Sequence, residues 1–189
     1  MRHALGRSST MYENGQSRLS KATRLILNSK LKMEILKEKK VARVIKEAVL
    51  KGEQLKMAVT TDSMRPFLRP GDKVVAKKCT PAHLACGDII LYMLDYVSYV
   101  HRFILKKEKD NRLFLITKAD KATYFNTPTP SSELIGKVIA VEKDGFYINL
   151  DGILWKAINR FLGLSSFLEA VIFNFLRFVK RKILNRKPA

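Results

Sequence analysis

The sequence predicts a mainly β domain, α+β overall, that is flanked by amphipathic helical segments on both sides. Between residues 53 and 147, short runs of β-branched and aromatic residues alternate with turn signals, a pattern typical of antiparallel strands. On both sides of this region, apolar residues recur three or four positions apart, which is the spacing of a helix with one apolar face. The turn signals are Gly71-Asp72, Gly87-Asp88, Asp110-Asn111 and Gly145.

The composition is that of a globular protein with a large positive charge. Of the 189 residues, 47% are hydrophobic and 28% are charged, which excludes a disordered chain. Lys and Arg outnumber Asp and Glu by 36 to 17, so the formal net charge is +19. A charge of this size predicts an anionic partner, either an acidic membrane surface or nucleic acid.

The N-terminal part of the chain divides into two segments. Residues 1–21 are polar, basic and rich in serine, which predicts a flexible basic arm. They contain no continuous apolar stretch of the kind found in a cleavable secretory signal. Residues 22–52 have the spacing of one or two amphipathic helices, and Gly52 supplies the stop signal.

The C-terminal segment, residues 153–185, predicts amphipathic helices with a large apolar face opposite a basic stripe. We expect them to lie in an anionic membrane interface, with packing on the β domain or on a partner as the alternative. A membrane span is disfavoured because Glu169 and Arg177 would each cost about 2–3 kcal/mol in hydrocarbon. The sequence therefore predicts a cytoplasmic protein that is peripheral at the membrane.

The stretch "TTDSMRPFLRPGD" (residues 60–72) follows a short strand pattern. Met57 and Val59 alternate with polar neighbours, which is the period of a half-buried strand. Two prolines stiffen the stretch, and a Gly-Asp turn ends it. Ser63 is therefore expected where a strand ends and an irregular segment begins, a position that exposes its hydroxyl.

Four short motifs follow one another along the predicted β domain. In order, they are Ser63-Met64-Arg65-Pro66 with Gly71-Asp72, Gly87-Asp88-Ile89-Ile90, Val100-His101-Arg102 and Thr117-Lys118-Ala119-Asp120. In this order and spacing they resemble the signal peptidase I family, in the branch that uses histidine where other members use lysine. The resemblance covers about residues 55–146 and ends with "LIGKVIAVEKDG", which resembles the closing strand of the family.

This resemblance implies a signal peptidase/LexA-like β catalytic domain and a serine endopeptidase that cleaves a peptide or leader segment. Ser63 would be the nucleophile, because a serine hydroxyl near a base becomes reactive. His101 would be the general base, with an imidazole that is mostly neutral at pH 7. Asp120 would hold the base in one tautomer. The Ser63 N–H and the Thr61 hydroxyl would form the oxyanion hole.

The resemblance also implies where substrate binds. A peptide or protein substrate would dock as an extended strand beside the strand before the serine, which places Met57 and Val59 near the subsites. By analogy, small residues would be favoured at the cleavage site. No cofactor is implied. No metal site is expected, because Cys79 and Cys86 have no further cysteine beside them; we expect reduced thiols, with a disulfide between the two as the alternative.

Several positions depart from the family pattern. Asp62 stands where many members have glycine, and an anion there is expected to slow acylation. Ala119 replaces the glycine before Asp120. The second acidic residue of the family is missing, and "KATYFNTPT" offers only Asn126 or Thr127 in its place. The family's N-terminal membrane anchor has no counterpart, so membrane contact would come from the C-terminal helices.

Two other classes of protein stay open at the level of sequence. The first is a self-cleaving regulator of the LexA type, which uses a lysine base and carries a DNA-binding module. Residues 22–52 show no clear turn between two short helices, so they do not favour that module. The second is a non-catalytic protein on a protease-like scaffold that binds a membrane or, less favoured, nucleic acid.

Overall fold

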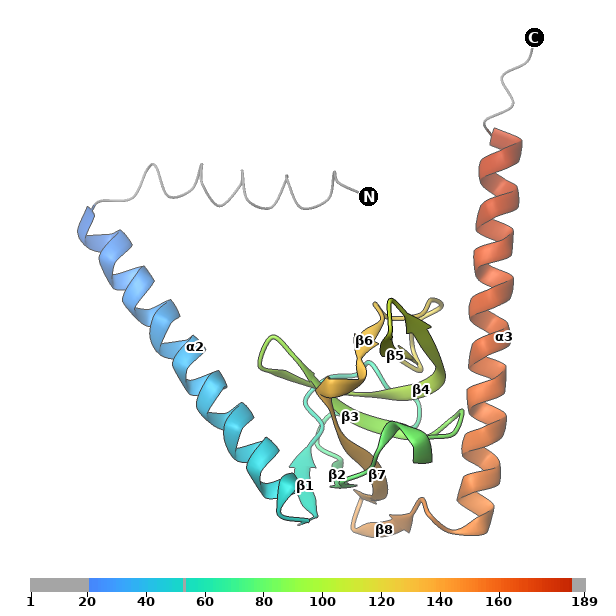
Figure 1. Ribbon diagram of the computed structural model, residues 1–189, viewed down its shortest axis with the longest axis horizontal. Helices are drawn as coiled ribbons and strands as arrows, with labels where there is room; N and C mark the ends of the chain where they lie inside the picture. Colours follow the sequence, from blue (N-terminus) through green and yellow to red (C-terminus); the bar gives the residue numbers. More distant parts are fainter. Residues whose placement is uncertain (1–20, 53, 185–189) are drawn as a thin grey trace. The chain divides into compact units, whose positions relative to one another are not determined.

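A computed structural model of the chain describes residues 21–52 and 54–184 (Figure 1). Apart from Lys21, the predicted basic arm lies outside the described residues, as does the end of the segment predicted over residues 153–185. The chain divides into two units, residues 1–41 and 42–189.

A single helix, α2 (Lys21–Leu50), covers the region for which the sequence allowed one or two helices. Within residues 29–41, every side chain that the structure describes is exposed. The end of α2 belongs to the second unit, where Ile45 packs against a buried cluster that includes Leu91. Gly52 has a φ of 81°, a left-handed conformation that favours glycine just after a helix.

The second unit is built on one antiparallel sheet, which confirms the predicted mainly β class. The strands are β1 (Leu55–Ala58), β2 (Lys73–Lys77), β3 (Ile89–Leu94), β4 (Val97–Lys109), β5 (Arg112–Lys118), β6 (Thr129–Pro130), β7 (Leu134–Lys143) and β8 (Phe146–Asn149). Their order is β1-β2-β7-β3-β4-β5-β6, and β8 pairs with β7. Short 3-10 turns, η1 (Pro81–His83) and η2 (Ser131–Glu133), lie in the connections.

The hairpin turns follow the local sequence where it contains turn residues. Asp110 and Asn111 have φ values of 51° and 55° between β4 and β5, at a predicted turn. The turn between β3 and β4 was not among the predicted signals. There Asp95 and Tyr96 have φ values of 48° and 67°, the left-handed pair that a two-residue hairpin requires.

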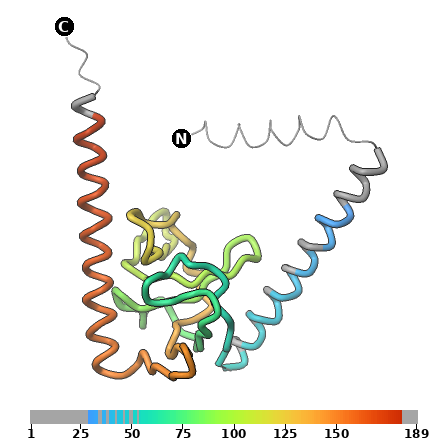
Figure 2. The backbone as a smooth tube through the Cα atoms, turned by 180° about the vertical axis from the view of Figure 1, so that it is seen from behind, coloured from blue at the N-terminus to red at the C-terminus, as the bar shows by residue number. Residues whose placement is uncertain are grey.

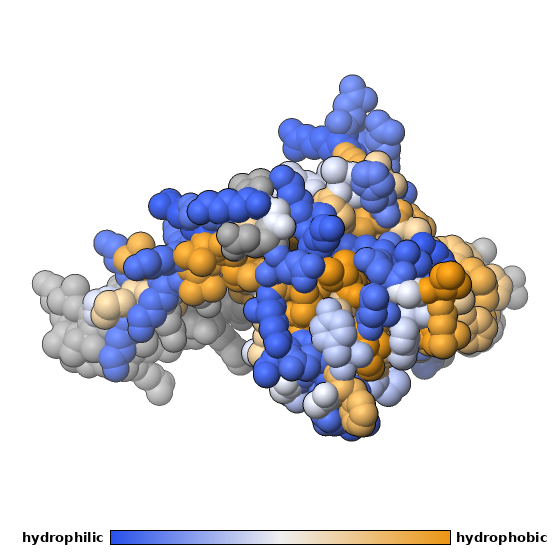
Figure 3. Space-filling model, turned by 90° about the horizontal axis from the view of Figure 1, so that it is seen from below, coloured by the Kyte–Doolittle hydropathy of each residue, from blue (hydrophilic) through white to orange (hydrophobic). Residues whose placement is uncertain are grey.

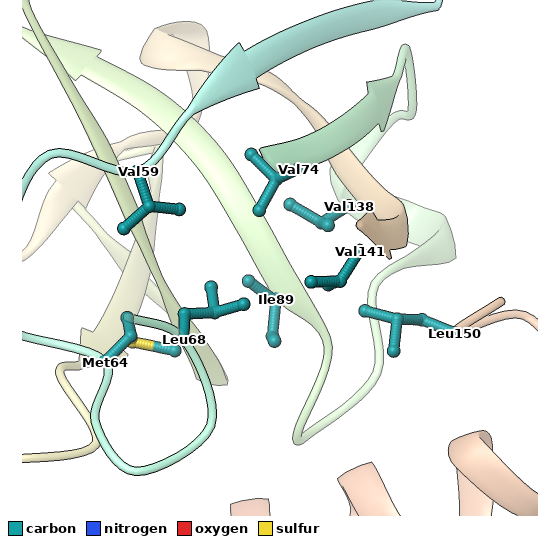
Figure 4. Packing of buried hydrophobic residues seen from close by; sticks show 8 residues of the cluster. All are labelled: Val59, Met64, Leu68, Val74, Ile89, Val138, Val141 and Leu150. Carbon is teal, nitrogen blue, oxygen red and sulfur yellow. The ribbon is translucent and has the colours of Figure 1, made fainter. Parts of the chain in front are cut away.

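One buried cluster joins the sheet to the loop between β1 and β2. Figure 4 shows these side chains pointing toward one another from several segments: Val59, Met64, Leu68, Val74, Ile89, Val138, Val141 and Leu150. Met64 and Leu68 belong to the loop, and they are 1% and 0% exposed. Each buried side chain of this size stabilises the fold by about 1.5–3 kcal/mol, so the loop is anchored to the core.

A single helix, α3 (Ile153–Leu184), docks on the sheet domain through its first half. Gly163 is buried where α3 meets Gly87, and a Cβ added at Gly163 would lie 2.5 Å from the Gly87 Cα. Trp155 packs against Phe67 with ring centroids 5.7 Å apart. Two glycines are thus needed for this close approach of helix and loop.

Candidate active site

Ser63 is held by a loop with both ends tied together. The loop runs from β1 to β2 (teal in Figure 2). The Val59 N–H donates to the Asp72 carbonyl at 2.8 Å, and the Gly71 N–H donates to the Val59 carbonyl at 2.9 Å. Because the residue after Ser63 is buried in the core, the half-buried Ser63 side chain is fixed at the surface.

His101 lies on β4, opposite Ile90 of β3, and it is 9% exposed. His101 and Ser63 line one cavity of about 390 Å³, although they come from segments far apart in the sequence. Met57, Val59 and Thr61 line the same cavity. The structure therefore brings together five of the six residues that the sequence singled out. Within residues 54–184, no hydrogen bond joins the Ser63 and His101 side chains. In sites without substrate, the hydrogen bond between a nucleophile and its base is often too long to form.

The Nδ1 atom of His101 has two polar neighbours. Tyr92 Oη and Asn126 Nδ2 each lie 2.8 Å from it. Asn126 Nδ2 also donates to Thr117 Oγ1 at 3.0 Å, and Tyr92 Oη lies 3.4 Å from the same hydroxyl. The imidazole is thus held on one side by neutral side chains, and its Nε2 has no hydrogen-bond partner in the described part of the chain.

Asp120 does not make the contact with His101 that the sequence predicted. Arg102 takes both of its carboxylate oxygens, through Nε and Nη2, at 2.8 Å each. Arg102 is fully buried and also donates to the Gly87 carbonyl and to Asn159 of α3. A planar guanidinium matches a carboxylate in this two-pronged way, so Asp120 is held by the residue next to the predicted base.

Burial decides the charge state of His101. It lowers the pKa of the imidazole to about 4, and the more distant Asp120 carboxylate opposes this only in part. Desolvation disfavours the charged form of a base, so His101 is neutral at pH 7. A neutral imidazole is able to accept a proton.

Tyr92 is a neighbour of His101 that the sequence did not predict. It lies on β3, two residues from Ile90, on the face that His101 shares. The strand register could have identified Tyr92. Residues two positions apart on a strand project from the same face, so Tyr92 lies on the same face as Ile90, which pairs with His101. For Asn126, the sequence predicts only a place in the stretch where the second acidic residue is missing.

The neighbours of Ser63 compensate the charge that the sequence placed there. Asp62 pairs with Lys121, whose Nζ lies 2.5 Å from the carboxylate. This contact lowers the pKa of Asp62, and the Lys121 N–H donates to the Ser63 carbonyl at 3.0 Å. Thr61 Oγ1 lies 3.2 Å from Ser63 Oγ. A cation therefore accompanies the anion beside Ser63.

Lys118, in the motif that ends at Asp120, contacts the helix α3. It is completely buried, and its Nζ donates to Glu169 of α3 at 2.8 Å. Cys79 and Cys86 are free thiols. Among residues 21–52 and 54–184, no cluster of three His, Cys, Asp or Glu side chains is arranged to hold a metal ion.

Many exposed side chains of α3 are apolar, and orange atoms gather at the right of Figure 3, where the beginning of the helix is seen from below. By length and composition, Ile153–Arg181 is long and apolar enough to cross a membrane, and 11% of its most apolar window is buried. The exposed side chains include Leu154, Phe161, Leu164, Leu168, Ile172, Phe175 and Leu176. Buried Asn159 and Ala170 lie on the other side of the helix, which is the side that contacts the sheet domain.

Neither comparison with known proteins assigns a family: no protein-family model matches the chain, and no curated protein matches it at a significant level.

Proposed function

We propose that this protein is a serine endopeptidase of the signal peptidase type, with Ser63 as nucleophile and His101 as general base. The observation that carries the proposal is the shared cavity of about 390 Å³, which Ser63 and His101 line together with the strand that precedes the serine. A nucleophile and a neutral base in one cleft, beside a wall that accepts an extended peptide, fit amide hydrolysis.

The direction of proton transfer depends on the imidazole tautomer. His101 must carry its own proton on Nδ1, so that Nε2 accepts the proton of Ser63. In the structure Asn126 presents Nδ2 to Nδ1, and half a turn of its amide presents Oδ1 instead. Together, Asn126 Oδ1 and Tyr92 Oη then accept from Nδ1–H, and Thr117 donates to the turned amide. In this proposal, neutral acceptors replace the usual carboxylate.

The oxyanion of the tetrahedral intermediate needs preorganised donors. The Ser63 N–H donates to no other group in the described part of the chain, and the Thr61 hydroxyl lies beside Ser63 Oγ. These are the two donors that the sequence assigned to the oxyanion hole. The Asp62–Lys121 pair limits the repulsion that an unpaired carboxylate would exert on a developing negative charge.

Labelling with a fluorophosphonate tests this proposal, because an activated serine hydroxyl attacks its phosphorus, displaces fluoride and becomes phosphonylated. Ser63 is expected to be labelled in the wild type, and labelling is expected to fall by at least about 100-fold in Ser63→Ala and His101→Ala. Ser98 lines the same cavity, so Ser98→Ala is the matched control and should retain labelling. Equal labelling of wild type and Ser63→Ala in folded protein would disprove the assignment.

Self-cleavage of the LexA type is less well supported, because Lys118 is paired with Glu169. Two fragments that appear on incubation in the wild type but not in Ser63→Ala would favour it. Loss of all labelling would favour the non-catalytic reading.

We also propose an anionic membrane surface as a partner, with α3 lying in its plane. The first half of α3 is docked on the sheet domain, so only residues 171–184 project beyond it, about 21 Å of helix. That length is shorter than the roughly 30 Å hydrocarbon core of a bilayer. Asn174, Arg177 and Arg181 continue the polar face of the docked half, which leaves the apolar face to the lipid.

A further inference from the structure

A second cavity, of about 450 Å³, is lined by His101 but not by any residue of the loop that carries Ser63. It shares His101 and Tyr99 with the first cavity, so the two cavities are neighbours at the imidazole. Ser63 lines only the first. The remaining walls of the second cavity come from β3 and from the loop between β5 and β6: Tyr92, Leu94, Tyr124, Phe125, Asn126 and Thr127.

The lining of this cavity is rich in aromatic side chains and contains no Asp, Glu, Lys or Arg, and its histidine, His101, is neutral at pH 7. In a chain with a formal charge of +19, a site without Lys or Arg is poorly suited to an anion and well suited to an apolar group. Tyr92 and Tyr99 stack with ring centroids 5.5 Å apart, and Tyr124 remains 55% exposed at the rim.

The outer wall of the second cavity, which is the loop between β5 and β6, is held in place by contacts with the sheet and with α3. The Asn126 N–H donates to the Thr117 carbonyl at 2.8 Å, which ties the loop to β5. Phe125 packs against Phe167 of α3, with ring centroids 6.0 Å apart. Because the loop is fixed from the sheet and from the helix, the cavity is a preformed site.

The chemistry of acyl transfer assigns the two cavities to different parts of the substrate. When Ser63 Oγ bonds to the carbonyl carbon, its proton passes to His101; when the C–N bond then breaks, His101 returns that proton to the leaving amine. The acyl part stays on Ser63, and the amine departs from beside His101. The cavity that contains His101 without Ser63 is therefore placed for the amine side of the scissile bond.

We propose that this tyrosine-lined cavity binds the residue on the amine side of the cleaved bond and selects an aromatic side chain there. The inference rests on the proposed peptidase function and extends it to substrate specificity. An aromatic ring would contact the Tyr99 and Tyr124 rings, an interaction that an aliphatic or charged side chain does not make.

Transfer of the acyl group from Ser63 to an added amine tests the cavity without a known substrate. Ser63 is acylated with p-nitrophenyl acetate, and phenylalaninamide or alaninamide is added. The amine attacks the ester carbon, forms the N-acetyl amide and frees Ser63, with His101 taking the amine proton and returning it to Oγ. We expect transfer to phenylalaninamide to be about fivefold to tenfold faster than transfer to alaninamide.

The variants separate this cavity from general effects. Tyr124→Ala should reduce the preference for phenylalaninamide to about twofold or less, and Tyr124→Phe should restore it. Tyr147→Ala, at an exposed tyrosine of β8 outside both cavities, is the control and should keep the wild-type preference. Equal rates for the two amides, or a preference that survives Tyr124→Ala, would overturn the inference while leaving the nucleophile in place.

If no acyl-enzyme forms, that outcome counts against the peptidase proposal. Binding of the amides to the second cavity is then measured directly. Phenylalaninamide and alaninamide are titrated into Ser63→Ala while the His101 ring resonances are followed by NMR. Perturbation that saturates at lower concentration with phenylalaninamide supports the aromatic site, and identical titrations contradict it.

Discussion

Asn126 and His101 meet at a distance of 2.8 Å between the amide nitrogen and Nδ1. The family resemblance leads one to expect a carboxylate beside the base, but Asp120 is bound to Arg102. An amide keeps the ring in place without favouring its charged form, and this agrees with the lowered pKa of His101.

Replacement of the Asn126 amide by a carboxylate should raise the pKa of His101. In Asn126→Asp, we expect the pKa of His101 to rise from about 4 to about 5–7, because a nearby anion favours imidazolium. The pH below which Ser63 labelling declines should rise together with this pKa. NMR titration of the ring measures the pKa, and Asn111→Asp in an exposed turn is the control. An unchanged pKa would show that Asn126 does not contact the ring in solution.

The buried histidine should make stability depend on pH. The folded pKa of His101 is about 4 and the unfolded value is about 6.5, so protons favour the unfolded chain below pH 6.5. The contribution is fully present above that pH and falls as pH decreases toward 4, by about 2 kcal/mol between pH 7 and pH 5. Urea unfolding of wild type and His101→Gln at both pH values measures it. An equal loss in both proteins would contradict the shift.

The same pKa changes the expected pH profile of the reaction. An ordinary histidine predicts that Ser63 labelling falls below about pH 6. With His101 at about 4, labelling should persist to about pH 5 and fall near pH 4. A midpoint near 6.5 would mean that the ring is solvated in solution.

The contact between α3 and the sheet domain should not tolerate a methyl group at Gly163. Its Cβ would lie 2.5 Å from the Gly87 backbone, so Gly163→Ala should cost about 1–3 kcal/mol of unfolding free energy or displace the helix. Gly152→Ala, where the nearest atom would be 3.5 Å away, is the control. Urea unfolding and hydrogen exchange of α3 report the two outcomes. Wild-type stability and exchange in Gly163→Ala would argue against the observed docking.

Membrane binding should depend on the apolar face of α3. Phe161→Glu combined with Phe175→Glu should weaken binding to phosphatidylglycerol-containing vesicles by about tenfold or more, because buried apolar area is lost and negative charge is added. Phe146→Glu, at an exposed phenylalanine on β8, is the control. Flotation of the double variant at the wild-type level would remove α3 as the membrane contact, and no flotation of the wild type would remove the membrane proposal.

Much of the fold follows from local signals. Alternating apolar residues and turn residues predicted the antiparallel strands, and the apolar spacing predicted helix on both sides, because these patterns depend on neighbours in the chain. The specific signal peptidase-like fold stays a prediction. The Asp95-Tyr96 turn was not predicted, since no glycine or asparagine marks it.

The candidate site could be predicted only in part. Spacing along the chain was enough to single out Ser63 and His101, because each stands in a recognisable motif. The partner of Asp120 and the neighbours of Nδ1 depend on strand register, on the loop that carries Asn126, and on the burial of Arg102 against α3. A buried guanidinium without a carboxylate is strongly destabilising, so packing pairs Asp120 with Arg102. The side chains that contact Nδ1 of His101 are then Tyr92 and Asn126.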